Sequence, residues 1–226
     1  MKLVHPDFFC SMEFVENQIE TVIIESPQIL SAYFSELQNQ IEGTGEGQWR
    51  LSEKGELLQI DKNCNMLLNP FQLDLNNRKI VTALYNMIDK EVKNSELLLE
   101  WNRIFPILAE RLECLLQAID YRFSYVDKLE LKDFLKFMNV RYQDESVCFF
   151  EKLLDYIRLT HEILKIKLFV LVNFKPFLTN EQMVYLHEQN CYVKYQILLV
   201  EGYDMSNRRI PGERVTIIDK DGCVIQ

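Results

Sequence analysis

The sequence predicts an α/β protein in which a head domain with a mainly parallel sheet carries an inserted, all-helical leg domain. Two observations predict this class. Strongly apolar strand patterns lie near both chain ends, at residues 19–26, 166–174 and 195–202, and a helical pattern fills much of the chain between them. Near-continuous apolar strands are typical of a parallel sheet that helices cover on both faces.

The sequence predicts where the two domains begin and end. We assign residues 1–71 and 161–226 to the α/β head domain and residues 72–160 to the helical leg domain. The chain has 226 residues, of which 48% are hydrophobic and 12% aromatic. A chain of this length and composition can bury a sizeable core.

The first predicted strand ends at Pro27 and leads into a helix. Proline suits a first helical turn, and apolar residues then recur at helical spacing up to Ile41. Gly43 opens a cluster of three glycines within five residues. A phosphate-binding loop needs a strand before it and a helix after it, whereas two short strands joined at Lys54-Gly55 follow this cluster. We therefore interpret the glycines as a helix stop and connector.

The predicted leg begins near Asn76, where the pattern becomes helical for almost ninety residues. Its longest apolar stripe runs from Leu97 to Ile119 in steps of three and four residues. Pro106 lies inside this stripe, and we expect it to kink or divide the helix. Shorter helices are predicted over residues 128–139 and 146–164.

The chain then returns to strands after Lys165. A buried strand at residues 166–174, a helix at 179–190 and a second strand at 195–202 form a predicted βαβ unit. Residues 213–226 add a last strand and a turn. Together with the N-terminal strand, these elements complete the head.

Charge and cysteine usage limit the class of protein. The net charge is −9, and residues 1–60 hold ten acids but three bases, so most positive charge lies later in the chain. A local basic surface is still possible in an acidic chain.

The six cysteines are widely spaced and form no CxxC pair, so we expect reduced, mostly buried thiols. We expect a cytoplasmic protein without a secretion signal or membrane span.

Catalytic motifs are scarce. The three histidines, His5, His161 and His187, lie far apart in the sequence, and neither HExxH nor GxSxG nor a phosphate-loop motif occurs. We therefore interpret each histidine as structural. The end of the strand at 166–174 offers Asn173, Lys175 and Thr179, at a position where α/β sheets often bind ligands, but it lacks an acid-base pair.

Basic residues form a more informative pattern. Lys128, Lys132 and Lys136 follow one another at steps of four, which would place them on one side of a helix. Two interpretations remain open: the solvated face of an amphipathic helix, or a ridge that contacts phosphate. The candidate nucleic-acid-binding residues are Arg78, Lys79, Lys128, Lys132, Lys136 and Arg141.

Five segments of the sequence, in order, resemble a known family. They look like the short-form adaptation protein of type II-A CRISPR systems, the Csn-two family. The segments are VIIESPQIL, DKNCNMLLNPFQLDLNNRKI, LKDFLKFMNVRY, KIKLFVLVNFKPFLTNEQ and TIIDKDGCVI.

This resemblance implies a fold and a function. The implied fold is an α/β head similar to nucleotide-binding ATPases, without the phosphate loop, plus a helical leg. The implied protein is a non-enzymatic bacterial homotetramer, a ring whose lysine-lined hole holds ends of double-stranded DNA during spacer acquisition in antiviral defence. Lys136 and the pair Arg78-Lys79 match basic positions of the family. Integrase proteins and an RNA-guided nuclease are the implied partners, and no nucleotide is expected.

Calcium is a further implied ligand, but the acidic stretch that would hold it is reduced here. The segment AIDYRFSYVDKLEL keeps mainly Asp120 and Asp127. Calcium usually takes six to eight oxygen ligands, so two carboxylates would need help from backbone carbonyls. The alternative function is an enzyme of the nucleotide-kinase type with a helical lid, against which the missing phosphate loop counts.

Overall fold

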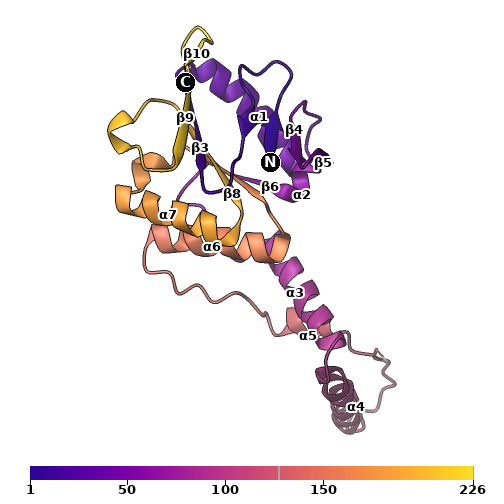
Figure 1. Cartoon of the computed structure of the whole chain (residues 1–226). Coiled ribbons are helices and arrows are strands. Elements are labelled where there is room, and N and C mark those ends of the chain that lie inside the picture. The colour runs from indigo at the N-terminus through magenta and orange to yellow at the C-terminus, as the bar shows by residue number, and fades with distance from the viewer. Residues whose placement is uncertain (127, 226) are drawn as a thin grey trace. The chain divides into compact units, whose positions relative to one another are not determined.

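The computed structural model describes residues 1–126 and 128–225 and shows an α/β protein (Figure 1). The chain divides into two compact units. The first, here called the sheet unit, comprises Met1–Asp74 and Glu145–Gln226; the second, the helical unit, comprises Leu75–Asp144. These bounds differ from the predicted ones, because the helix over 149–164 belongs to the sheet unit rather than to the leg.

The sheet unit is built around a six-stranded mixed sheet. Its strand order is β10-β9-β3-β8-β7-β6, in which the neighbours from β9 to β6 are parallel and β10 is antiparallel. Strands from both ends of the chain share this sheet, as the apolar runs predicted. The strands are β3 (Ile19–Ile24), β6 (Cys64–Leu67), β7 (Leu168–Val172), β8 (Gln196–Glu201), β9 (Glu213–Ile218) and β10 (Val224–Ile225).

A second, antiparallel sheet belongs to the same unit, with the order β2-β1-β4-β5. Its strands are β1 (Lys2–Val4), β2 (Met12–Glu13), β4 (Arg50–Glu53) and β5 (Glu56–Leu58). The predicted turn joins β4 to β5: Lys54 and Gly55 both have positive φ, 52° and 87°, as a two-residue hairpin turn with the right twist requires. The pairing of β1 with β2 was not predicted.

Helices cover the large sheet. In Figure 1, α1 (Pro27–Glu42) lies on one side of the sheet, and α6 (Phe149–Leu164) and α7 (Asn180–Val193) lie together on the other. Gly43 ends α1 in the left-handed conformation, with φ 71°, which an amino acid without Cβ adopts at low cost. The first glycine of the cluster is therefore a helix C-cap. A single-turn helix, α2 (Ile60–Asn63), precedes β6.

The helical unit contains α3 (Arg78–Lys93), α4 (Leu97–Leu116) and α5 (Leu131–Phe137). Its core is small: Val81 and Tyr85 of α3 pack with Leu131 and Leu135 of α5. Helix α4 contributes no buried residue and continues through Pro106 without being divided. Within the described ranges, no helix combines the length and apolar character needed to cross a bilayer.

The cysteines correct one expectation. All six are free thiols, but Cys114, Cys148 and Cys223 are exposed and only Cys64 is buried. The prediction of mostly buried thiols is wrong, because three of the six positions lie on exposed surface although free cysteine is usually buried.

A buried polar cluster lies beside the parallel sheet. Lys175, which follows β7, forms an ion pair with Glu213, and the Thr21 hydroxyl donates to the same carboxylate at 2.6 Å. The backbone N–H of Lys175 donates to Oε1 of Glu201 at 3.0 Å. Glu201 is 1% exposed, and its Oε2 has no hydrogen-bond partner among the described residues. Burial raises the pKa of the Glu201 carboxyl from 4.5 to about 7.

This raised pKa predicts how stability depends on pH. The unfolded chain releases the Glu201 proton first, so the free energy of unfolding should fall as pH rises from about 4.5 to 7. Glu201 should account for about 3 kcal/mol of this fall in the free energy of unfolding. Glu201→Gln should therefore remove that part of the pH dependence. Urea denaturation of both proteins at pH 4.5 and 8 measures it, with the exposed Glu46→Gln as control. Identical pH dependence in the wild type and Glu201→Gln would show that Glu201 is ionised in the folded state.

Candidate nucleic-acid interface

Four of the six candidate basic residues line one hollow in the helical unit. The hollow has a volume of about 420 Å³ and lies between α3, α5 and the segment that follows α5. Its cationic lining residues are Arg78, Lys132, Lys136 and Arg141. The described residues that line it include no carboxylate, so the surface is suited to an anion.

Helix α3 supplies one wall. Asn77 caps the helix by accepting a hydrogen bond from the backbone N–H of Ile80 at 3.1 Å, which starts the helix at Arg78. Val81 and Tyr85 then face the core, whereas Thr82 and Asn86 are exposed at the hollow. The capped start of α3 therefore sets which side chains reach this surface.

Helix α5 supplies the two lysines. Leu131 and Leu135 are buried four residues apart, and this places Lys132 and Lys136 together on the neighbouring face. Their side chains are 43% and 65% exposed. The same period that builds the core thus presents both ammonium groups to solvent.

Each of these lysines lies within ion-pair distance of a carboxylate and remains partly exposed. The Lys132 Nζ lies 3.7 Å from Oδ2 of the buried Asp89, which also accepts a hydrogen bond from Lys93 at 2.9 Å. The hydrogen bond from Lys93 lowers the pKa of Asp89, and the charge of Lys132 adds to the effect. Asp89 is therefore ionised at neutral pH. Lys136 pairs with Asp133 at 3.0 Å.

Arg141 is fixed by two asparagines that the sequence analysis did not single out. Its Nε donates to Asn139 Oδ1 at 2.9 Å, and its guanidinium also donates to the carbonyl of Asn76. The Asn76 side chain in turn bonds both the backbone N–H and the carbonyl of Tyr142. These hydrogen bonds attach the segment 139–142 to the residues just before α3. Arg141 and Arg78 therefore line the same hollow.

The other two candidate basic residues lie elsewhere. Lys79 is exposed on α3 and does not line the hollow. Lys128 precedes α5, which begins at Leu131, and it forms an ion pair with Glu130 at 2.6 Å and lines a different pocket. The predicted ridge of three helical lysines is therefore wrong in its first member: the four-residue spacing extends beyond the helix.

The structure describes one of the two candidate metal residues. Asp120 is exposed, and Asp127 lies outside the described residues. Within residues 1–126 and 128–225, no group of three or more His, Cys, Asp or Glu side chains could hold a metal ion.

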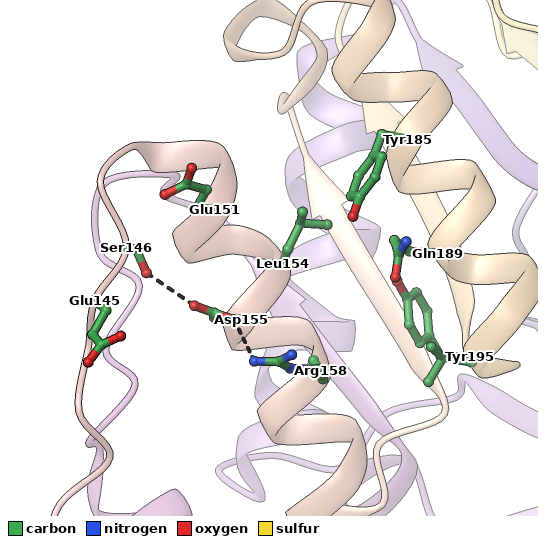
Figure 2. Close-up of a pocket in the computed structure, with 10 residues that line it drawn as sticks. Glu145, Ser146, Glu151, Leu154, Asp155, Arg158, Tyr185, Gln189 and Tyr195 are labelled. Carbon is green, nitrogen blue, oxygen red and sulfur yellow. Dashed lines mark hydrogen bonds and ion pairs between the residues drawn. The ribbon is translucent and has the colours of Figure 1, made fainter.

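A second hollow, in the sheet unit, has the opposite charge. It is about 290 Å³ and lies between α6, α7 and the segments beside them (Figure 2). Its charged lining residues are Glu145, Glu151, Asp155 and Arg158. Asp155 accepts hydrogen bonds from Ser146 and Arg158, at 3.3 and 2.8 Å, as the dashed lines of Figure 2 show. Three carboxylates against one guanidinium make this hollow unsuitable for phosphate.

The end of β7, where an α/β enzyme would bind a ligand, is filled by the chain itself. Lys175 is paired with Glu213, and Thr179 caps α7 through a reciprocal pair of bonds with Gln182. The Asn173 side chain accepts from the backbone N–H of Gly202 at 3.0 Å. The three polar residues noted in the sequence thus stabilise the fold.

Residues 43–222 match the family described as CRISPR-associated protein (Cas_Csn2). No curated protein matches the chain.

Two solved structures are distantly similar. One is cbiO1 from Clostridium perfringens, part of the ABC transporter complex cbiONQ: identity is 14%, coverage is 96% of this chain and 79% of that one, and the TM-score is 0.47. The other is MJ1267 in its ADP conformation, an ATP-binding cassette of an ABC transporter: identity is 12%, coverage is 96% and 82%, and the TM-score is 0.43. Scores this low do not establish a shared fold.

Proposed function

The chain belongs to the CRISPR-associated Cas_Csn2 family, and we propose that it is a non-enzymatic ring protein that binds ends of double-stranded DNA during spacer acquisition. The observation that carries this proposal is the hollow lined by Arg78, Lys132, Lys136 and Arg141. Exposed cations that face a common surface attract the phosphate backbone without selecting a sequence. Binding would therefore be independent of base sequence.

The distribution of charge supports the helical unit as the DNA-binding part. Residues 75–144 contain eleven acidic and eleven basic residues, so the whole net charge of −9 belongs to the sheet unit. A polyanion is repelled by the sheet unit and meets no net repulsion at the helical unit. The acidic character of the whole chain is therefore compatible with DNA binding.

The alternative, an enzyme of the nucleotide-kinase type, is disfavoured by the occupied sheet edge. Such an enzyme uses a phosphate-binding loop between a strand and a helix, whereas the glycine that follows α1 ends a helix. Lys175, the cation nearest the end of β7, is buried and already paired with Glu213. A phosphate would have to displace this internal ion pair.

The exposed apolar face of α4 supports assembly into a homotetramer. Leu97, Ile104, Leu108, Leu112 and Leu115 are all at least 38% exposed, and they recur at helical spacing. A contiguous apolar face of this kind marks an interaction surface. Copies of the chain that cover it would close a ring and bring several cationic hollows together.

Further partners, a ligand and a compartment complete the proposal. We propose that CRISPR integrase proteins and the RNA-guided nuclease bind this chain, and that Asp120 contributes to a calcium site. We propose the bacterial cytoplasm as the compartment.

Removing the two lysines of α5 should weaken DNA binding and its dependence on salt. In Lys132→Ala/Lys136→Ala, each lost phosphate contact should flatten the slope of log K against log salt by about 0.9. Affinity for a linear duplex at about 150 mM salt should fall at least tenfold. Fluorescence anisotropy over a series of salt concentrations measures both quantities.

The matched control replaces two exposed lysines of the sheet unit, Lys62→Ala/Lys220→Ala, and so changes net charge equally. It should leave the slope unchanged. If the α5 variant retains wild-type affinity and slope, the ridge is a solvated helix face and the proposed DNA site is wrong.

The proposed assembly predicts the mass in solution. Light scattering at micromolar concentration should give four times the mass of one chain, and Leu108→Glu/Leu112→Glu should lower it because a charge is costly in an apolar interface. Leu57→Glu, at an exposed leucine of β5, is the control and should leave the mass unchanged. A wild-type monomer would contradict the ring.

A closed ring also predicts which forms of DNA can bind. A ring loads over a free end, so linear duplex should bind and a relaxed, covalently closed circle of the same sequence should not. Retention of the two forms is compared in a filter assay, and cutting the circle once should restore binding. Equal retention of both forms would rule out threading.

A further inference from the structure

The hollow of the helical unit is larger than phosphate binding requires. Cations on an exposed surface suffice to follow a DNA backbone, whereas this surface forms an open hollow of about 420 Å³. Volumes of that size are typical of pockets for small organic ligands. The volume of the hollow therefore needs an explanation beyond its charge.

The floor of the hollow is apolar. Val81 and Tyr85 line it and are 8% and 6% exposed, because both pack against Leu131 and Leu135 in the core. The Tyr85 hydroxyl donates to the carbonyl of Val140 at 3.0 Å, which fixes the ring in place. A rigid apolar floor favours a flat apolar group and offers nothing to a phosphate.

One wall of the hollow carries polar side chains that have no hydrogen-bond partner among the described residues. Thr82 and Asn86 are exposed one turn apart on α3 and line the hollow. Neither side chain makes a hydrogen bond within the described part of the chain. A hydroxyl and an amide together can donate to and accept from the polar edge of a heterocycle.

Cations surround this floor and wall. Arg78 and Arg141 present planar guanidinium groups, which suit two oxygens of one phosphate, and Lys132 and Lys136 add two point charges. An apolar floor, a polar wall and a cationic rim are the three parts that one nucleotide needs.

From this arrangement we infer that the hollow binds a single nucleotide, with its base on the Val81–Tyr85 floor and its phosphate at the four cations. Two sources share this chemistry: a free nucleoside monophosphate and, if the proposed DNA-binding function holds, an unpaired nucleotide at a duplex end. A base at an end leaves its stack at less cost than an internal one. The hollow would then distinguish a frayed end from a blunt one.

The test uses the full chain and a substitution that fills the hollow without changing its charge. Thr82→Trp places a bulky ring at the exposed wall, and Asn86→Trp is a second filling variant. Met87→Trp, at an exposed position of the same helix outside the hollow, is the matched control. Thermal unfolding by circular dichroism confirms that each variant is folded.

Calorimetric titration uses 2′-deoxyadenosine 5′-monophosphate and orthophosphate as probes. The nucleotide should bind at least about tenfold more tightly than orthophosphate, since the base adds its own contacts. Both filling variants should remove this advantage, and Met87→Trp should retain it. Equal binding of the two probes by the wild type, or undiminished nucleotide binding in both filling variants, would overturn the inference.

A second arm identifies the source of the nucleotide. Duplexes with a blunt end and with one unpaired terminal nucleotide are compared for the wild type and Thr82→Trp. Tighter binding of the unpaired end, lost in Thr82→Trp, assigns the hollow to DNA ends; no difference, together with binding of the free monophosphate, assigns it to a free nucleotide.

The failure of this inference is distinguishable from failure of the proposed function. The proposed function fails if Lys132→Ala/Lys136→Ala leaves blunt-duplex affinity unchanged, whereas the inference fails if the wild type binds the nucleotide no more tightly than orthophosphate. If the lysines matter and the filling variants behave as wild type with every probe, DNA binding stands and the nucleotide site does not.

Discussion

The packing of α5 against α3 is the contact on which the candidate interface depends. Leu131 and Leu135 can face Val81 and Tyr85 only if α5 is helical over those residues, and the helical period then places Lys132 and Lys136 beside each other at the hollow. Core and interface are thus two consequences of one helix orientation. A change that rotates α5 would lose both, so a core substitution would disturb the proposed DNA site as well as the fold of the helical unit.

The small size of this core has a consequence for assembly. Four buried residues stabilise the packing of α3 and α5, whereas α4 has twenty residues and buries none. Most helical stability in proteins comes from packing an apolar face, and α4 meets this core through the partly buried Trp101 while most of its leucines stay exposed. A partner that covers its leucines would stabilise the helix and the interface together, which links the proposed ring to the proposed site.

Sequence patterns predicted those parts of the fold that depend on local order. The strands β3, β7 and β8 are mainly apolar in sequence and are buried almost throughout, and a cluster of glycines marked the end of α1. Both signals could be recognised because each lies in a few consecutive residues. The pairing of β1 with β2 could not be predicted, since strands of three and two residues gain their stability from distant partners. The family assignment was predicted correctly from five dispersed segments.

In the candidate site, too, the sequence predicted what depends on local spacing and missed what depends on distant contacts. The spacing of Lys132 and Lys136 was sufficient to place them together, but the same spacing included Lys128, which lies before the helix and pairs with Glu130. Spacing does not show where a helix begins. The bonds from Asn76 to Tyr142 join residues 66 positions apart, and no local pattern indicates them.

Net charge is a poor guide to binding when the charge is divided between units. The helical unit is neutral overall, yet its cations are sorted: Asp89 and Asp133 hold Lys132 and Lys136 from the side, and the lining of the hollow is left without a carboxylate. Because the field at a surface falls off within about 8 Å at physiological salt, the residues that line the hollow say more about what it attracts than the net charge of the chain does.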